Sequence, residues 1–371
     1  MPEAAPGRAG RPAAGERGAG GDRLLELDGI RALAVLAVIA DHLLVFALQV
    51  REPAAALFFW LGLAGVRYFF VLSGFVIARR LLAEHARTRT ISLQGFWRRR
   101  AFRILPACWA YLGVVALLAA AGWIRANGAS LAWSALFVAN LKPVDWFHDH
   151  IWSLSVEEQF YLLAPLGALA LLGRRRIWSA AVLAAVFLGC LFWHRLEHAL
   201  AYAHVTARLE FLSQFRFIIC GVLPALFAEK LTPWLRAWAG GWVAALAAVT
   251  ALMRDMPVHY WEKIALQCLQ PLAIAAVIGW IAVNGGRCSW LRQGVLQWIG
   301  RRSYSLYLWQ QLFLCPAGAV RFAISPLLRV CSVPLTFAAS ALSYRFIERP
   351  LNRVGHGGGS VEAASRRVSP G

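Results

Sequence analysis

The chain has 371 residues, of which 59% are hydrophobic and only 15% are charged. Apolar runs of about 18 or more residues recur along it, which excludes an ordinary soluble domain and predicts an all-α, polytopic membrane protein. The net charge of +19 is compatible with nucleic-acid binding, but the arginines lie mainly between the apolar runs, so we expect no nucleic-acid partner. The seven cysteines are scattered without a CxxC pair, which predicts neither a disulfide framework nor a metal site.

The ends of the chain differ in composition from the part between them. Residues 1–23 are rich in Ala, Gly, Pro and Arg, and we expect a disordered cytoplasmic tail rather than a signal peptide. Residues 24–353 form the predicted membrane domain, and residues 354–371 a second loose cytoplasmic tail. Ten apolar segments are long enough, or nearly so, to cross a bilayer: 27–49, 57–78, 104–123, 152–173, 177–194, 209–228, 238–252, 264–284, 303–320 and 327–344. The apolar stretch 131–141 is too short and is expected to be re-entrant or to lie at the surface.

The distribution of lysine and arginine sets the expected orientation. With the N-terminus inside, most of the 38 basic residues fall in segments that face the cytoplasm. We therefore expect both termini to be cytoplasmic, in a multi-pass protein of the cell inner (plasma) membrane whose excess charge faces anionic membrane lipid. No stretch predicts a large soluble domain, so the expected chemistry takes place within the helix bundle or at its mouths.

The first apolar segment, "LDGIRALAVLAVIADHLLVFALQV" (27–50), carries two residues that a bilayer makes costly, Arg31 and His42. Eleven positions at 100° each place them within roughly 20° of one another around the helix and roughly 16 Å apart along its axis. We expect Arg31 near the cytoplasmic boundary and His42 in the outer half of the membrane. A snorkelling arginine and a histidine bonded to a nearby carbonyl would explain the pair without function, whereas a neutral imidazole at that depth suits a general base.

A pair of carboxylates follows in "HDHIWSLSVEEQFYLLAP" (148–165), which enters the membrane from the outside. Glu157 and Glu158 are expected at a depth comparable with that of His42. Adjacent helical residues point about 100° apart, so only one carboxylate faces any given site, and the sequence leaves open which. Such a carboxylate would orient a histidine and stabilise its charged form. The alternative is an interfacial belt in which the glutamates face lipid headgroups.

The segment "FWRRRAFRILPA" (96–107) places three arginines, Arg99, Arg100 and Arg103, at the entrance to the third expected span. Arginine binds phosphate bidentately, so this cluster suits a polyphosphate ligand. Charge alone does not distinguish such a site from the ordinary excess of basic residues in cytoplasmic loops.

Weaker signals come from "GVRYFFVLSGFVIA" (65–78) and from the outer loops. Ser73 stands next to a glycine, which predicts a close helix–helix approach, and no base is assignable to it as a nucleophile. Arg67 is expected either to snorkel outward or to line a cavity. His148 and His150 lack metal-ligand spacing, and we expect both to be solvated.

These segments together resemble the acyltransferase family 3 membrane proteins over roughly residues 24–353. The similarity lies in the order and spacing of six stretches: "LDGIRALAVLAVIADH", "GVRYFFVLSGFVIA", "FWRRRAFRILPA", "WSLSVEEQFYLLAP", "SYSLYLW" and "ERP". The arginine–ten–histidine spacing and the WSLxVEEQFY run are specific in combination, although either alone would be weak.

The resemblance implies a ten-helix bundle that moves an acyl group, commonly acetyl from acetyl-CoA, onto a hydroxyl, usually of a sugar. Acyl-CoA is then the donor substrate, no metal is implied, and the acceptor is a carbohydrate, a lipid-linked glycan or a glycosylated metabolite. It assigns catalysis to Arg31, His42 and Glu157, and donor binding to Arg99, Arg100 and Arg103. Arg67 and Gln310 depart from the family pattern, which expects an acidic or small polar residue and a histidine; both positions bear on acceptor specificity.

The mechanism we expect places the CoA phosphates on the arginine cluster and runs the pantetheine arm along the first helix toward His42. Glu157 would then fix the tautomer of the histidine. The rival hypothesis is a proton-coupled transporter or exporter that uses Arg31, His42 and Glu157 as a relay, and it predicts inverted repeats that the sequence does not contain. A catalytically inactive scaffold is disfavoured because the ionisable residues of three groups are all present: Arg31 with His42, the pair Glu157 and Glu158, and the arginine cluster of 96–107.

Overall fold

The computed structural model describes residues 24–172, 174, 176–202, 210–237, 241, 243 and 260–365. Within these residues every named element is helical, which confirms the predicted all-α class. The expected tail 1–23 lies outside the described residues, as do residues 366–371 and all but two positions of the expected span 238–252.

The N-terminal third consists of long helices. They are α1 (Leu25–Asp41), which continues as a π-helix (His42–Ala47), α2 (Ala54–Thr88) and α3 (Leu93–Ala120). Helix α3 begins where Ser92 caps it by accepting a hydrogen bond from the backbone of Gly95. The arginine segment 96–107 is therefore part of a helix rather than a loop before one.

The middle of the chain begins with short helices and continues with longer ones. They are α4 (Gly128–Ala135), α5 (Trp146–Asp149), α6 (Ile151–Leu171), α7 (Arg176–Tyr202), α8 (Glu210–Leu226) and α9 (Ala228–Ala237). The expected short segment 131–141 is divided between α4 and a 3-10 turn (Ala139–Leu141), neither of which is long enough to cross a bilayer.

The C-terminal part alternates long and short helices. They are α11 (Tyr260–Val283), a 3-10 segment (Gly285–Arg292), α12 (Gly294–Arg301), α13 (Ser303–Phe313), α14 (Pro326–Ser343), a π-helix (Tyr344–Glu348) and α15 (Arg349–Ser365). Residues 354–365, expected as a loose tail, continue α15, in which Gly355 is buried against Phe102 of α3.

Five of the described helices are long and apolar enough to cross a membrane, and α8 with α9, which meet at 94°, would make a sixth if they form one span. The chain is thus a multi-pass membrane protein, and the number of ten spans and the cytoplasmic termini stay predictions. The expected span 303–320 differs from the structure, because α13 has 11 residues and the helix ends at Phe313.

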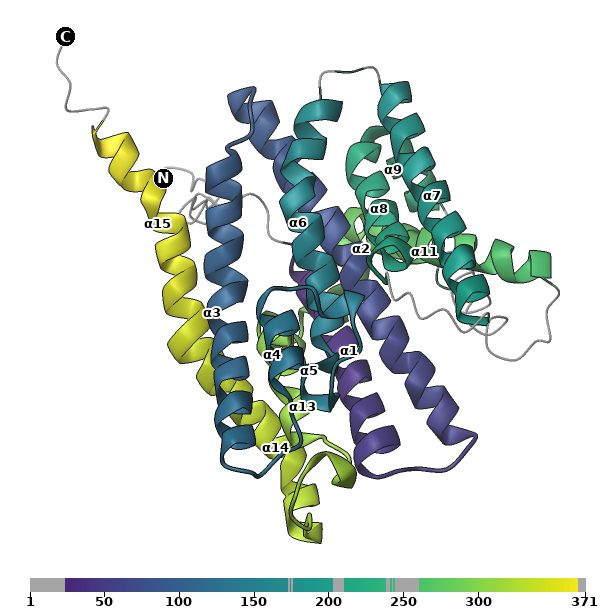
Figure 1. Cartoon of the computed structure of the whole chain (residues 1–371). Helices are drawn as coiled ribbons and strands as arrows, with labels where there is room; N and C mark the ends of the chain where they lie inside the picture. The colour runs from purple at the N-terminus through teal and green to yellow at the C-terminus, as the bar shows by residue number, and fades with distance from the viewer. Residues whose placement is uncertain are drawn as a thin grey trace, which may run out of the picture.

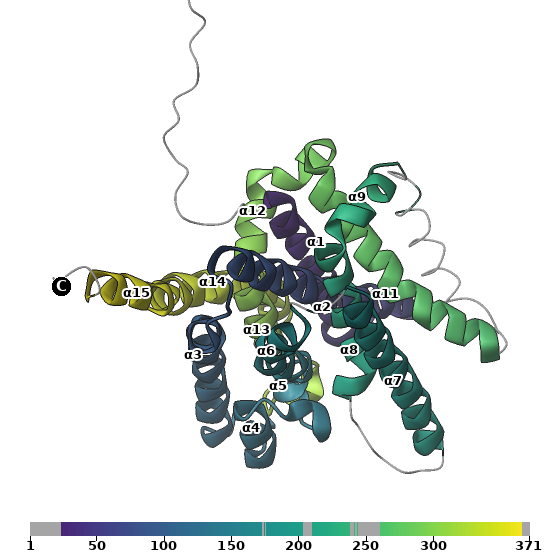
Figure 2. The ribbon, with the colours of Figure 1, turned by 90° about the horizontal axis from the view of Figure 1, so that it is seen from above.

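Helix α2 lies at the centre of the bundle, between α1 and α8, while α3 and α15 lie side by side at one edge (Figures 1 and 2). Glycines bring α2 and α8 together. A Cβ added to Gly74 would collide with the backbone carbonyl of Ile218, and one added to Gly221 would collide with that of Val71. This reciprocal contact confirms the close helix–helix approach predicted for the segment around Ser73.

Candidate active site

A polar cavity of about 70 Å³ lies where α1, α2, α3, α6 and α13 meet. Its polar lining residues are Arg31, Ser73, Arg100, Arg103, Ser153, Glu157, Tyr161, Ser303, Tyr304 and Tyr307. The cavity therefore brings together residues from three segments that the sequence singled out and that are far apart in the chain: Arg31 of the first, Glu157 of the second, and Arg100 and Arg103 of the third.

The carboxylate of Glu157 faces this cavity and is held by two hydroxyl groups. Ser73 donates its hydroxyl to Oε1 of Glu157 at 2.7 Å, and the Tyr161 hydroxyl lies 3.3 Å from Oε2. The Ser73 and Tyr161 oxygens are 3.1 Å apart, so the three groups form a closed cluster. Glu158 is not among the lining residues, so of the two adjacent carboxylates it is Glu157 that faces the cavity.

The arginine cluster of α3 is divided by the structure. Arg100 and Arg103 line the cavity, and the guanidinium of Arg100 lies 4.9 Å from the centre of the Tyr161 ring. Arg99 does not line it and instead lies 3.4 Å from a carboxylate oxygen of Glu84 on α2. A helix turns 100° per residue, so Arg100 and Arg103 point roughly 60° apart, and Arg99 lies roughly 40° beyond Arg103 on the side away from Arg100.

A further arginine, Arg80 on α2, was not singled out from the sequence. It acts electrostatically on the same region, within range of Arg31, Arg99 and Arg103. The signal that identifies it is its spacing from Ser73, because seven residues are close to two helical turns and place both side chains on one face of α2.

His42 lies in the π-helix that ends the first span, and it contacts α5 and α13. Its Nδ1 is 2.5 Å from Oε1 of Gln310, and its ring centre is 5.5 Å from that of Trp146. An amide oxygen only accepts, so Nδ1 carries the hydrogen, and in the neutral imidazole Nε2 then keeps its lone pair. The expectation that Glu157 orients this histidine was wrong, because Gln310 is its hydrogen-bond partner and Glu157 is bonded to hydroxyls.

His42 is not among the cavity-lining residues, but its partner Gln310 lies about one helical turn beyond the lining residue Tyr307. Gln310 follows Tyr307 by three residues on α13, a rise of about 4.5 Å. Tyr307 lines the cavity, and its hydroxyl is 2.5 Å from that of Ser153. Arg329 of α14 donates to the backbone carbonyl of Ala47 at the end of the π-helix.

His148 and His150 are buried, with 0% and 3% of their surfaces exposed, so the expectation that they are solvated was wrong. Nδ1 of His148 lies 2.7 Å from a carboxylate oxygen of Asp145, and the His150 ring packs edge-on against Tyr111 at 5.2 Å. Burial alone would raise the pKa of Asp145, but hydrogen bonds from His148 and from the backbone of Asn127 outweigh it and hold that pKa below its usual value. The three-residue spacing of Asp145 and His148 was the signal for this pair.

Arg67 neither snorkels nor lines the polar cavity. Its side chain is 8% exposed, donates to Oε1 of Gln270 at 2.8 Å and lies over the Phe217 ring. This places it in a buried contact between α2, α8 and α11.

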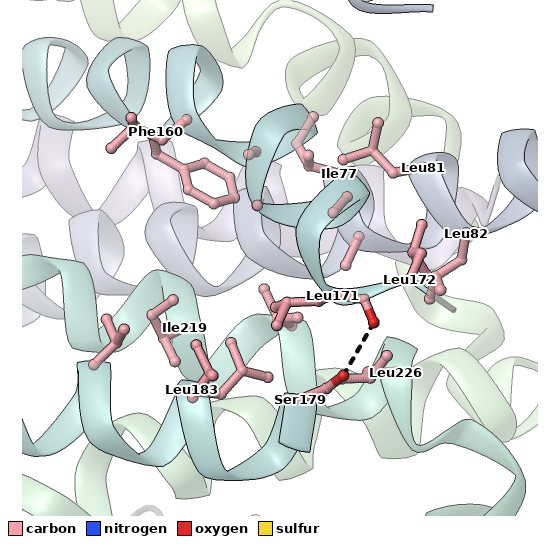
Figure 3. Close-up of a pocket in the computed structure, with 18 of the residues that line it drawn as sticks. Ile77, Leu81, Leu82, Phe160, Leu171, Leu172, Ser179, Leu183, Ile219 and Leu226 are labelled. Carbon is pink, nitrogen blue, oxygen red and sulfur yellow. Dashed lines mark hydrogen bonds between the residues drawn. The ribbon is translucent and has the colours of Figure 1, made fainter. Parts of the chain in front are cut away.

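A second, larger cavity of about 280 Å³ lies between α2, α6, α7 and α8 (Figure 3). Apart from Ser179, whose hydroxyl is bonded to the Leu171 carbonyl at 3.3 Å, its lining residues are apolar. No ionisable side chain in the described part of the chain lines it, so acid–base or phosphate chemistry has no group to use there. The smaller, polar cavity is the candidate active site. No cluster of three or more potential metal ligands occurs among the described residues.

The described helices place a buried carboxylate, hydroxyls and arginines around one cavity, an arrangement that suits an integral membrane enzyme. Residues 24–345 match the family model described as an acyltransferase domain. The chain belongs to this acyltransferase family.

Its curated relatives carry matching names. The chain is 27% identical to the peptidoglycan O-acetyltransferase OatA of Listeria monocytogenes over 89% of its own length and 56% of that protein. It is 28% identical to the O-acetyltransferase OatA of Staphylococcus aureus (strain NCTC 8325 / PS 47) over 89% of its length and 57% of that protein. The chain thus spans about half the length of these relatives. No solved structure matches it.

Proposed function

We propose that this chain transfers an acetyl group from acetyl-CoA to a hydroxyl of a carbohydrate or glycosylated acceptor at the plasma membrane. One observation supports this most strongly. The buried carboxylate of Glu157 and the hydroxyl of Ser73 share a cavity with three arginines, and a histidine is bonded to Gln310, one turn beyond that cavity on α13.

The arginines supply the donor site. Arg100 and Arg103 line the cavity from α3, and Arg31 lines it from α1. Guanidinium groups bind phosphate through paired hydrogen bonds, and three cations around one small cavity without a matched number of carboxylates attract a polyphosphate such as that of CoA. In this arrangement the phosphates lie toward the arginines and the thioester lies toward Glu157 and Ser73.

His42 is the proposed general base for the acceptor. Because Gln310 holds the hydrogen on Nδ1, the Nε2 lone pair is available to accept the proton of an incoming hydroxyl. Trp146, whose ring packs beside the imidazole, provides an aromatic face of the kind on which sugar rings rest. The acceptor therefore approaches from the side of α5 and α13, and the donor from the side of α3.

The glycan nature of the acceptor draws on the relative from Listeria monocytogenes, which is named as acting on peptidoglycan. A glycan offers many equivalent hydroxyls, and Gln310 is the residue beside the base that differs from the histidine of the family pattern. We assign to this position the choice among acceptor hydroxyls.

The transport alternative is less well supported. A proton relay through Arg31, His42 and Glu157 requires these residues to exchange protons in sequence. Glu157 is bonded to Ser73 and Tyr161, and His42 is bonded to Gln310, so no direct step joins the carboxylate to the imidazole.

The test uses the protein in lipid nanodiscs, incubated with acetyl-CoA labelled in the acetyl group and with an envelope fraction as the acceptor. Free CoA and alkali-labile acetate in the glycan fraction are both measured. We expect both to form, and His42→Ala to reduce both by roughly 10²–10⁴-fold, the usual contribution of a general base. If the unaltered protein forms neither free CoA nor acetylated glycan, the proposed function is refuted.

A further inference from the structure

The hydroxyl of Ser73 and the carboxylate of Glu157 form a pair that the sequence did not reveal, since no base was assignable to this serine. We propose that Ser73 is a covalent acyl carrier: it takes the acyl group from the thioester as an ester and then yields it to the acceptor. This inference rests on the proposed function and adds a second covalent step to it.

The geometry of the pair is that of a nucleophile and its base. Oγ of Ser73 donates to Oε1 of Glu157 at 2.7 Å, within the distance that general-base catalysis requires. Both side chains line the polar cavity, so a thioester carbonyl that enters it meets the serine oxygen directly. The second oxygen of Glu157 lies 3.3 Å from the Tyr161 hydroxyl, which fixes the orientation of the carboxylate.

Some buried helical serines in the described chain donate to a carboxylate on another element: Ser73 to Glu157, and Ser305 and Ser343 to Glu348. Of these three serines, Ser73 alone lines the polar cavity. A serine within a helix ordinarily donates to a carbonyl in the preceding turn of its own helix. Ser155 donates in this way to Ile151, and Ser340 to Thr336. Ser73 instead donates across the bundle to a carboxylate on α6, in a cavity rather than in a packed interface.

The backbone that carries Ser73 is held rigidly. Gly74, the next residue, lies against the Ile218 carbonyl, and Gly221 lies against that of Val71, so α2 and α8 are locked at this level. A nucleophile on a fixed helix keeps its position relative to its base and to the incoming carbonyl, which is the condition for efficient attack.

The cations around the cavity suit both negative charges that the reaction creates. Arg31, Arg100 and Arg103 line the same cavity as the nucleophile. Attack on the thioester places charge on the carbonyl oxygen, and departure of CoA places charge on sulfur. Positive groups already in place stabilise both without reorganisation.

The two steps balance as follows. In the first, Oγ of Ser73 bonds to the thioester carbonyl carbon, its proton passes to Glu157, the C–S bond breaks and CoA leaves as the thiolate. In the second, the acceptor oxygen bonds to the same carbon, its proton passes to His42, the C–Oγ bond breaks and Ser73 recovers the proton from Glu157. His42 then releases its proton to solvent.

This sequence gives separate tasks to the two bases that the structure holds apart. Glu157 is bonded to Ser73 and serves the donor, while His42 is bonded to Gln310 one turn away and serves the acceptor.

The experiment omits the acceptor. Purified protein in nanodiscs is mixed with acetyl-labelled acetyl-CoA, quenched in acid and digested, and label on peptides and free CoA are measured over time. We expect a burst of about one CoA per protein molecule, with the label on the peptide that contains Ser73. Ser73→Ala should abolish the burst and the label, whereas Ser155→Ala, a buried serine of α6 outside the cavity, should leave both unchanged.

A second variant separates a carrier from a structural hydroxyl. Ser73→Cys places a thiol at the same site, so any trapped acyl group becomes a thioester that neutral hydroxylamine cleaves, unlike the serine ester. Label retained by Ser73→Ala, or found on Tyr161, overturns the carrier role while leaving the transferase intact. If the unaltered protein transfers acetyl groups to an envelope fraction but shows no burst or label without it, the carrier step is refuted alone. Failure of both assays refutes the proposed function and the carrier together.

Discussion

Nδ1 of His42 lies 2.5 Å from the amide oxygen of Gln310, a residue that follows it by 268 positions in the chain. Because the amide oxygen cannot donate, this contact selects one tautomer of the histidine and directs its free lone pair away from α13. The proposed base is thus oriented by a neutral side chain, where the sequence led us to expect a carboxylate.

Replacing Gln310 tests this relationship. Gln310→Leu removes the acceptor and leaves a buried N–H group unpaired, which costs about 1–3 kcal/mol and should reduce turnover roughly ten- to hundredfold. Gln310→Glu keeps an acceptor oxygen at the same place and should retain more activity than the leucine variant. Initial rates of transfer from labelled acetyl-CoA provide the measurement, and equal activity of the leucine variant and the unaltered protein would show that the contact does not serve the reaction.

The donor site predicts a change in affinity rather than in rate. Arg100→Ala removes a cavity-lining guanidinium, and the loss of charge-assisted hydrogen bonds to phosphate, worth about 1.5–3 kcal/mol, should raise the apparent KM for acetyl-CoA roughly ten- to hundredfold. The matched control is Arg87→Ala, an exposed arginine near the end of α2. An unchanged KM in the Arg100 variant would exclude this arginine from donor binding.

Replacing glycine by alanine should change stability in opposite directions at two positions, one inside the contact between α2 and α8 and one outside it. Gly74→Ala forces a methyl group against the Ile218 carbonyl and should destabilise the protein by about 1–3 kcal/mol. Gly113→Ala on α3 has open space around it and should stabilise by about 0.5–1 kcal/mol. Unfolding midpoints in the same detergent compare them, and a stable Gly74 variant would contradict the locked contact.

The pair of Asp145 and His148 predicts a dependence of stability on pH. The folded-state pKa of Asp145 is lowered, so the ionised carboxylate contributes stability that is present above its unfolded value, about 3.9, and is lost as pH falls through the folded value. Asp145→Asn should lower stability at neutral pH by about 1–3 kcal/mol and reduce the loss on acidification. Unfolding curves between neutral and acidic pH test this, and parallel curves for both proteins would count against it.

The fold class and the identities of several cavity residues could be predicted from the sequence, for a physical reason. Arg31 and Glu157 are costly in lipid, so an apolar chain that contains them places them inside the bundle, and both line the polar cavity. Helical periodicity also anticipated that only one of two adjacent glutamates would face the site.

The partners of these residues could not be predicted in the same way. Whether Glu157 meets His42 or Ser73 depends on how α1, α2 and α6 are packed, and periodicity within one helix carries no information on that. The sequence marked Ser73 only as a sign of close helix approach and Gln310 only as a departure from the family pattern, because neither residue's partner lies on its own helix. The short α13 escaped prediction because hydropathy reports an apolar run and not where the helix ends.

The claim on which the account depends is that the chemistry takes place at the carboxylate facing the polar cavity. Transfer of label from acetyl-CoA by Glu157→Gln and Glu158→Gln tests it most directly, because the two residues are adjacent on α6 and only the first lines the cavity. We predict that Glu157→Gln loses roughly 10²–10⁴-fold in turnover while Glu158→Gln stays within about tenfold of the unaltered protein. Equal losses in the two variants, or the reverse order, would contradict the account.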